Sequence, residues 1–368
     1  MNPKVSDKNE VDDRLTFTLH DTNVSIANAI RRIILSDIPS VVFRTFPHTE
    51  NKMDITKNTT RFTNEILKQR LSCVPIHMTT DVPIDNFYIE VKKMNNTDEY
   101  MYVTTEDFNI FDKKTGKQLA DAQRNKIFPA DKLTKDHILF ARLRPGNEKS
   151  AGESLHFKAD FDVGTGRENG MFSVASVSSY INTIDPAKVN SEWSKEEKKV
   201  EGEMSPAELA LFKQNWMLLN AQRHFLNNSF DFTIESVGFY GNENLVVMAC
   251  DIMLDKIRVF SESVNDKTAE IKVSETTMNN CYDITLKNED YTLGKVLEFI
   301  LHEEYYKNDV LSFCGFKKFH PHDDDSIIRI AFTENQDMMY IYDTLISVCS
   351  LASDVYSKIK TNFQEESV

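Results

Sequence analysis

The sequence is poor in cysteine, and its few cysteines form no pattern that would hold a metal or a disulfide framework. Five cysteines are scattered over 368 residues, and no two of them form a CxxC pair. An odd, scattered set argues against a zinc ribbon and indicates reduced thiols in an intracellular compartment. We therefore expect no bound metal and no other cofactor. The cysteines are Cys73, Cys250, Cys281, Cys314 and Cys349.

Long apolar segments are also missing. The first residues lack the apolar core of a signal peptide, and no run approaches the roughly 20 apolar residues of a membrane span. We expect a soluble, intracellular protein. Hydrophobic residues still make up 40% of the chain, which is enough for folded cores. The length predicts about two domains.

Basic residues and catalytic motifs are scarce as well. Lysine and arginine number 43 against 57 acidic residues, which gives a net charge of −14 and disfavours nucleic-acid binding by the whole surface. No GxSxG, HExxH or Walker loop is present, so a hydrolase or a nucleotide-driven enzyme has little support. The chain is predicted not to be an enzyme by itself.

What the sequence does contain is an internal repeat. Residues 15–19 and 282–286 each alternate as a short strand and lead into a helix with apolar residues at helical spacing. Leu19 aligns with Leu286 and Ile30 with Leu297, both at an offset of 267 residues (286 − 19). Asn23 and Asp290 stand where N-caps are expected.

The two helices of the repeat carry apolar faces in the same phase. A small residue lies one turn before the central apolar residue in each, which would permit close approach to another backbone. A face of this kind is stable only when buried, so we expect the two helices to pack against each other. The predicted intramolecular interface consists of Ile26, Ala27, Ile30, Ile33, Leu293, Gly294, Leu297 and Leu301.

Each copy is predicted to continue into a hairpin and a long helix. In the second copy, strands at 310–316 and 326–332 form the hairpin, and a heptad seam runs from Met338 to Ile359. In the first copy, residues 41–46 are predicted to pair with 229–236. Aligning Ser229 with Ser326 gives an offset of only 97, so about 170 residues (267 − 97) are inserted into the first hairpin.

This pattern predicts an α+β fold with two strand–helix–hairpin–long-helix units that form an intramolecular pseudo-dimer. The first unit is discontinuous, over residues 1–47 and 228–268, and the second covers 269–368. A mostly antiparallel β insert domain fills 48–227. Within it we expect a helix at 63–71, strands near 87–91, 100–104, 138–143, 155–161 and 171–177, an exposed polar loop at 185–203 and a helix from Pro206 to Leu226.

Several short motifs occur in an order known from one protein family. Residues 28–39 read NAIRRIILSDIP, 64–76 read NEILKQRLSCVPI, 141–146 read ARLRPG, and GTG and ESVG follow at 164 and 235. They resemble the signatures of the alpha subunit family of cellular RNA polymerases, which includes the third-largest subunit of RNA polymerase II. The first two motifs are specific, whereas the short ones are weak alone. The cysteines that hold zinc or an iron–sulfur cluster in some relatives are absent from residues 77–227.

The second copy resembles the small partner subunit of the same enzyme, the eleventh. Residues 289–294 read EDYTLG, and CGF at 314 and HP at 320 correspond to that subunit's hairpin. Eukaryotes keep these two subunits on separate chains. The fused layout is similar to that of large nucleocytoplasmic DNA viruses, which implies a place in the host cytoplasm (a viral factory), the nucleus or the virion.

The resemblance implies a non-catalytic assembly subunit of a DNA-directed RNA polymerase. Such a platform docks the largest and second-largest subunits, has small zinc-binding subunits as neighbours, meets DNA only through the complex and forms no homo-oligomer. The first helix would dock on the second-largest subunit, although its arginines also fit a solvated basic face. The predicted partner-binding residues are Arg31, Arg32, Ser36, Asp37, Arg142 and Arg144.

Four alternatives stay open at this point. The glycines at 164–170 superficially suggest a phosphate loop, but their spacing and the flanking strands favour a hairpin loop. The tip with His320, His322 and three aspartates could hold a metal, although such tips are usually solvated turns. A stand-alone nucleic-acid-binding regulator on the same fold, or an enzyme in the insert, would be the competing functions.

Overall fold

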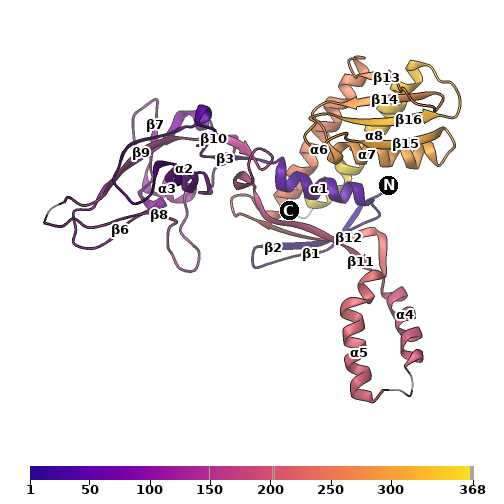
Figure 1. Ribbon diagram of the computed structural model, residues 1–368, viewed down its shortest axis with the longest axis horizontal. Coiled ribbons are helices and arrows are strands. Elements are labelled where there is room, and N and C mark those ends of the chain that lie inside the picture. The colour runs from indigo at the N-terminus through magenta and orange to yellow at the C-terminus, as the bar shows by residue number, and fades with distance from the viewer. Residues whose placement is uncertain (149, 201, 203, 365–368) are drawn as a thin grey trace. The chain divides into compact units, whose positions relative to one another are not determined.

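The computed structural model describes residues 1–148, 150–200, 202 and 204–364, which form two compact units (Figure 1). The first unit comprises Met1–Ile34, Val177–Glu235 and Asn242–Val368. The second comprises Leu35–Ser176 and Ser236–Gly241. Helices and several antiparallel sheets make up both units, so the predicted α+β class is confirmed. No helix among the described residues is long and apolar enough to cross a membrane.

The first unit contains a four-stranded sheet in the order β1-β2-β12-β11. Alternating apolar residues of β2 and β12 face the same side, and the rings of Phe17 and Phe232 stack with centroids 4.9 Å apart. Helix α1 follows β2, and the long helix α6 follows β12. The bounds are β1 Lys4–Val11, β2 Arg14–His20, α1 Val24–Ser36, β11 Ala175–Ile184, β12 Phe225–Ser236 and α6 Asn242–Asn265.

A second sheet in the same unit has the order β13-β14-β16-β15. Helix α7 follows β14 and widens into a single π-helical turn, η6, and the long helix α8 follows β16. The hairpin predicted at 310–316 and 326–332 is confirmed by the pairing of β15 with β16. The bounds are β13 Ile271–Val273, β14 Cys281–Leu286, α7 Tyr291–Leu301, η6 His302–Tyr306, β15 Leu311–Lys317, β16 Ser326–Phe332 and α8 Met338–Gln364.

The two sheets have matching topologies. In each, the strand before the short helix pairs antiparallel with the strand before the long helix: His20 lies opposite Ser229, and Leu286 lies opposite Ser326. The outer places also correspond, with β1 matching β13 and β11 matching β15. The internal repeat predicted from the sequence is therefore visible in the order of the strands.

The predicted pairing of residues 41–46 with 229–236 is wrong. Strand β3 (Pro39–Val42) pairs instead with β10 (Asp162–Thr165) in the second compact unit. Arg44 joins the two segments, because its Nε lies 2.7 Å from an oxygen of Asp162 and it also donates to the carbonyl of Val163. The place beside β12 is occupied by β11, so the first copy carries two insertions, one before and one after β11.

The first insertion forms most of the second compact unit. Its strands are antiparallel, in the order β4-β9-β5-β7 and as the pairs β6–β8 and β10–β3, and phenylalanine rings fill its core. The predicted helix at 63–71 is confirmed as α2, and the amide of Ile66 in its first turn donates to the Thr63 side chain. The bounds are β4 Met53–Asn58, α2 Asn64–Ser72, β5 Phe87–Met94, β6 Met101–Thr104, β7 Asn109–Asp112, α3 Asp121–Ile127, β8 Leu139–Leu143 and β9 Ser154–Asp160, with short 3-10 turns η1 His48–Glu50, η2 Ile84–Asn86, η3 Thr105–Asp107 and η4 Gly170–Phe172.

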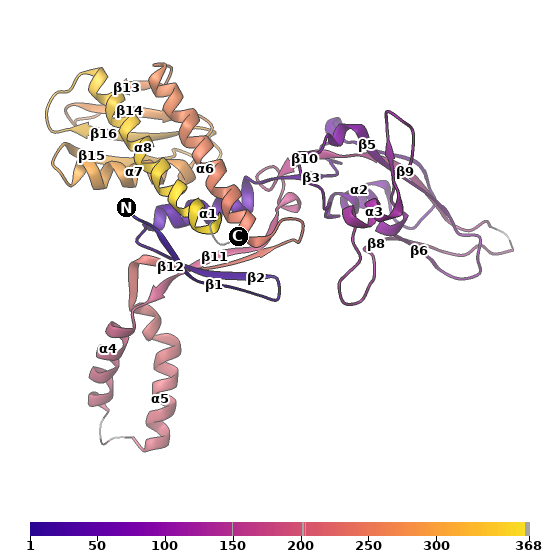
Figure 2. The ribbon, with the colours of Figure 1, turned by 180° about the vertical axis from the view of Figure 1, so that it is seen from behind.

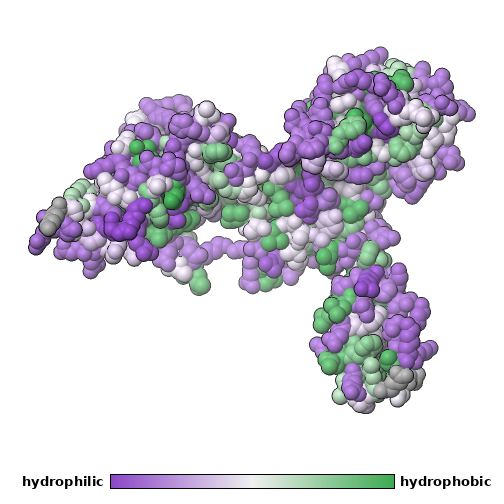
Figure 3. All heavy atoms as spheres, viewed as in Figure 1, coloured by the Kyte–Doolittle hydropathy of each residue, from purple (hydrophilic) through white to green (hydrophobic). Residues whose placement is uncertain are grey.

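The second insertion is a helical hairpin of α4 (Pro186–Lys199) and α5 (Pro206–Leu219). The polar loop predicted at 185–203 is wrong over α4, because Trp193 packs against Trp216 with ring centroids 5.5 Å apart. Residues 201 and 203 lie outside the described part. Helix α5 ends before the predicted Leu226, since η5 (Ala221–Arg223) and β12 follow. In Figure 3, hydrophobic residues show on the surface of this hairpin, in agreement with the exposure of Leu211, Leu218 and Leu219.

The long helices α6 and α8 pack along each other and join the two copies (Figures 1 and 2). The predicted seam of α8 is buried from Leu345 to Ile359, whereas Tyr342 is half-buried and Met338 is exposed, so the buried part of the seam begins about two turns after Met338. The seam is dry. Burial raises the pKa of the Cys349 thiol to about 12, and it raises the pKa of Cys250 on α6 further.

Candidate functional site

Helix α1 begins at an asparagine cap and buries one complete face. The backbone amide of Ser25 donates to Oδ1 of Asn23 at 2.9 Å. Asp290 caps α7 in the same way through the amide of Thr292. Both predicted caps are confirmed, because each side chain accepts from an amide that the helix itself leaves unpaired.

The two arginines of α1 have different surroundings. The guanidinium of Arg32 donates to Asp290 at 2.8 Å and to Thr292 at 2.9 Å, so it reaches the first turn of α7 in the second copy. Arg31 is half-buried, and its Nε donates to Asn28 at 3.0 Å within α1. Adjacent residues of a helix point about 100° apart, which explains why only one arginine faces the other copy.

The Arg32 contact was not foreseen from the sequence. A charged donor on a carboxylate that also caps a helix ties the start of α7 to α1 with charge-assisted bonds. The only available signal was the pairing of an arginine in one copy with an aspartate cap in the other. Arg32 is thus engaged inside the chain, and a direct role of this residue in partner binding stays a prediction.

All residues of the predicted intramolecular interface are buried in the first compact unit. The second copy's short helix packs on α8 and, less extensively, on α6, while α1 reaches α7 through Arg32. The direct packing of the two apolar helix faces on each other therefore stays a prediction. The side chains of Ile30 and Leu297 are 0% and 1% exposed.

The reason for the glycine in α7 differs from the expected one. A Cβ atom built on Gly294 would lie 2.0 Å from Cε2 of Phe316, a residue of β15 in the same copy. Tyr291 packs edge-on against this ring, with centroids 5.1 Å apart. The small residue thus makes room for an aromatic side chain of its own unit. The close approach of another backbone at this position stays a prediction.

Ser36 and Asp37 lie at the end of α1, in the second compact unit, and both contact Arg167 of the glycine-rich loop. Asp37 pairs with Arg167 at 3.1 Å, and the amide of Arg167 donates to the carbonyl of Ser36 at 2.7 Å. A Cβ on Gly166 would lie 2.3 Å from the carbonyl oxygen of Leu35, so the backbones touch. The glycine-rich loop is therefore a structural connection between strands β10 and β11. The predicted hairpin loop is wrong, because β10 pairs with β3 whereas β11 lies beside β12 in another sheet.

Arg142 lies on β8 and Arg144 just beyond it. The two side chains differ in how accessible they are to a partner. Arg144 donates to Glu153 through Nε at 2.6 Å, and its amide donates to the same carboxylate. Arg142 is exposed and lies over the ring of Tyr102, 5.3 Å from the centroid. An exposed arginine stacked on an exposed aromatic ring is the more accessible contact for a partner.

The hairpin tip at residues 319–325 forms a local turn. The amide of His320 donates to Asp323, and the amide of His322 donates to Nδ1 of His320. Within the described residues, no group of three histidine, cysteine or acidic side chains is placed to hold a metal ion.

Together, the duplicated sheets and the long-helix seam define a dimerisation module folded within one chain. Residues 16–257 match the RNA polymerase Rpb3/Rpb11 dimerisation domain, and the chain belongs to this family. The matched segment ends before the second copy begins. The resemblance of the motifs to the alpha subunit family is thereby confirmed.

Curated relatives point to the same class. The chain is 24% identical over 318 residues to DNA-directed RNA polymerases IV and V subunit 3B of Arabidopsis thaliana, a match that covers 74% of this chain and 95% of the relative. It is 26% identical over 313 residues to DNA-directed RNA polymerases I and III subunit rpac1 of Dictyostelium discoideum, covering 72% and 82%. An archaeal relative, DNA-directed RNA polymerase subunit Rpo3 of Pyrococcus furiosus, is 22% identical over 274 residues, covering 70% and 95%.

Proposed function

We propose that this chain is the non-catalytic assembly subunit of a DNA-directed RNA polymerase and docks the two large catalytic subunits. The observation that carries the proposal is the presence of two matching sheet-and-helix copies in one compact unit, joined along α6 and α8. A dimerisation module is complete only when both halves are present. Here one polypeptide supplies both halves, so no second alpha-like chain is required.

The domain layout that we propose has two dimerisation units and an insert in the first. Strand β11 is counted with the first unit rather than with the insert, because it occupies the place that β15 holds in the second sheet. The β-rich compact unit and the α4–α5 hairpin are then two separate additions. The same proposal includes contacts of these additions with small zinc-binding subunits. It also includes a role of the protein in a viral factory, the nucleus or the virion.

The contact with the second-largest subunit is assigned to α1 through Arg31. The side chain of Arg31 is partly accessible, and its Nε donates within its own helix, whereas the side chain of Arg32 holds the cap of α7. Arg142, exposed on β8, is a further candidate contact. In the second copy Glu298 and Phe299 stand at the positions equivalent to the two arginines, so the pseudo-dimer offers this basic edge on one side only.

Changing Arg31 to glutamate is expected to weaken docking without unfolding the chain. Charge reversal at an interface is repulsive and costs several kcal/mol, which corresponds to at least about a tenfold loss of affinity. The lost bond to Asn28 contributes about 1 kcal/mol or less to stability. Affinity purification of the tagged chain, with quantitative mass spectrometry of the second-largest subunit, measures the effect.

The matched control is Lys117→Glu, which reverses an exposed charge in the insert. It should recover the wild-type amount of the large subunits. Unchanged recovery with Arg31→Glu would remove this arginine from the docking surface. If the wild-type chain itself fails to recover the large polymerase subunits, the proposed function is wrong.

A further inference from the structure

The two copies also match where the short helix contacts the outer strand of its sheet. In the first copy, the hydroxyl of Ser178 on β11 donates to the carbonyl of Arg31 on α1 at 3.3 Å. In the second copy, the thiol of Cys314 on β15 donates to the carbonyl of Glu298 on α7 at 3.6 Å. Arg31 and Glu298 are 267 residues apart (298 − 31), which is the offset of the repeat. The two contacts are therefore equivalent and align β11 with β15.

The outer edge of β15 is closed by Glu298. Among the described residues, β15 pairs with β16 on one side and with no strand on the other. The backbone amide of Phe316 donates to Oε1 of Glu298 at 3.2 Å, and the other carboxylate oxygen accepts from Lys295. An edge strand is a template for another strand, and proteins commonly block such edges. Glu298 thus occupies an amide that an incoming strand would need.

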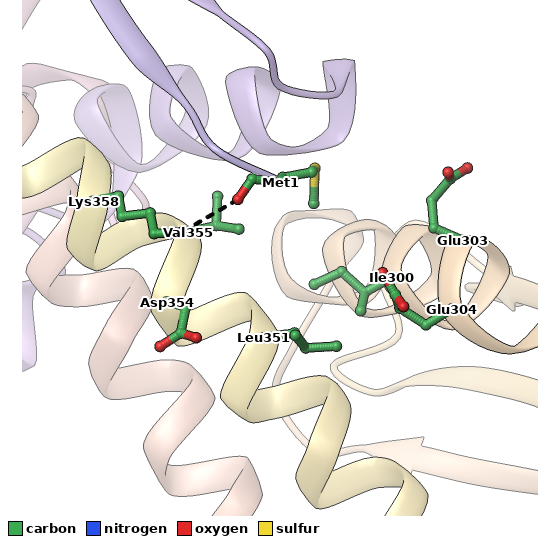
Figure 4. A pocket seen from close by; sticks show the side chains of 8 residues that line it. All are labelled: Met1, Ile300, Glu303, Glu304, Leu351, Asp354, Val355 and Lys358. Atoms are coloured by element: carbon green, nitrogen blue, oxygen red, sulfur yellow. Dashed lines mark hydrogen bonds between the residues drawn. The ribbon is translucent and has the colours of Figure 1, made fainter.

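The opposite side of α7 borders a hollow of about 340 Å³ between α7, η6 and α8 (Figure 4). Ile300 lines this hollow, and residues two apart on a helix point about 200° apart, which places Glu298 on the far side of α7. The hollow also holds Met1 and Lys358 beside its carboxylates, so its charges are mixed. It takes no part in closing the edge of β15.

The equivalent position in the first copy cannot close its edge. Strand β11 is likewise outermost among the described residues, with β12 as its neighbour. Two residues beyond the equivalent contacts, Tyr180 of β11 corresponds to Phe316 of β15. Arg31 stands in the place of Glu298, and a guanidinium has donors but no acceptor. It therefore cannot accept from the amide of Tyr180 as the carboxylate does from that of Phe316.

Strand β11 also lacks the charges that protect other sheet edges. It reads ASVSSYINTI over Ala175–Ile184, without a charged residue or a proline. By contrast, the outer strand β1 carries four charged residues and a bulge, and β13 is only three residues long and includes Lys272. Charged side chains, bulges and short length are the usual means of blocking an edge. Of the four outermost strands described in these two sheets, β11 alone has none of them and no carboxylate on its edge.

Arg31 brings a positive charge to this open edge. Helix α1 contains no acidic residue, so neither α1 nor β11 balances that charge. The ring of Tyr180 packs edge-on against Phe230, with centroids 5.4 Å apart. Burial raises the pKa of Tyr180, and the charge of Arg31 opposes this rise, as expected of a guanidinium near the strand. The edge is thus complementary to a strand that carries a carboxylate.

We propose that β11 receives an extended acidic segment of the second-largest subunit as a fifth strand of the first sheet. The identity of the partner rests on the proposed function. Main-chain hydrogen bonds to β11 hold the segment, and one of its carboxylates pairs with Arg31. The second copy does not bind in this way, because Glu298 already holds the amide of Phe316.

The closing role of Glu298 is tested in the full chain alone, by hydrogen–deuterium exchange. Glu298→Ala should speed exchange of the Phe316 amide about tenfold or more, because a hydrogen bond to a charged acceptor is lost. Glu304→Ala is the matched control, since it removes an exposed carboxylate of the same copy and should leave this rate unchanged. An unchanged rate in Glu298→Ala would contradict the closed edge.

Strand addition is tested by comparing the free chain with the assembled polymerase. Assembly should slow amide exchange within residues 178–184 at least about tenfold, since edge amides become paired. Residues 312–318 are the matched region of the second copy and should exchange equally in both states. If the second-largest subunit is present and exchange in β11 is unchanged, or if both regions slow equally, the proposal is wrong. Either result leaves the assembly role standing, because that role is measured by recovery of the large subunits.

Photocrosslinking in the assembled polymerase identifies the segment. Benzoylphenylalanine replaces Ile181, which is 61% exposed on β11, or Lys317, which holds the equivalent place on β15. Ile181 should crosslink to a peptide of the second-largest subunit that contains aspartate or glutamate, and Lys317 should not. Equal crosslinking from both positions, or none from Ile181 in a preparation that contains this subunit, would overturn the proposal.

Discussion

Replacing Leu297 by aspartate is expected to abolish cooperative unfolding of the first compact unit. Leu297 lies on the buried face of α7 and is 1% exposed. An unpaired carboxylate at such a position costs several kcal/mol, which is comparable to the whole stability of about 5–15 kcal/mol of a typical domain. Thermal unfolding followed by circular dichroism should lose its sharp transition.

The repeat predicts the same result for the equivalent residue of the first copy. Ile30 is the counterpart of Leu297 in the first copy and is fully buried, so Ile30→Asp should give the same loss. Val259→Asp is the matched control, because it places the same charge on α6 at a position that is 53% exposed. If Leu297→Asp or Ile30→Asp melts like the wild type and still recovers polymerase subunits, the two copies do not depend on each other.

Replacing Gly294 by alanine is expected to destabilise the protein by about 1–3 kcal/mol, although the position is inside a helix. Alanine normally stabilises a helix relative to glycine by roughly 1 kcal/mol. Here the new methyl group would overlap the ring of Phe316, whose Cε2 lies 2.0 Å from the Cβ position. Overpacking therefore outweighs the gain in helix propensity, and the free energy of unfolding decreases. Chemical denaturation of the wild type and the variant measures this difference.

The effect of Gly294→Ala on stability should change sign when the Phe316 ring is removed, which distinguishes overpacking from other causes. In a Phe316→Ala background the ring is gone, so Gly294→Ala should become neutral or stabilising. Gly170→Ala is the control, because a Cβ there would meet nothing within 4 Å. Its effect should stay within about 0.5 kcal/mol. A destabilisation by Gly294→Ala that persists without the Phe316 ring would show that the close contact lies with some other group.

The repeat could be predicted from the sequence because it depends on local rules. A capped helix start at Asn23 and Asp290, and the same apolar phase after each, fix β2–α1 and β14–α7 without knowledge of their partners. The β15–β16 hairpin followed from two alternating runs around a turn-rich segment. These elements depend on residues that are close together in the chain, so they can be predicted from the sequence alone.

The errors concern choices between partners. Of the predicted strand 41–46, only Val41 and Val42 belong to β3, and nothing local distinguishes β10 from β12 as its neighbour. The contact between Arg44 and Asp162, 118 positions apart, lies beside the observed pairing. Helix α4 was missed because its exposed charges hide Val189 and Trp193, which become visible as a core only beside Trp216. Among the proposed contacts, the role of Arg32 likewise required the position of Asp290 in space.

The central claim is that each copy covers the dimerisation surface of the other within one chain. Sedimentation equilibrium of the purified full-length protein tests this most directly, because an unpaired dimerisation surface would seek a second molecule. The account predicts a monomer of 42.4 kDa at low micromolar concentration. A stable dimer at the same concentration would contradict it.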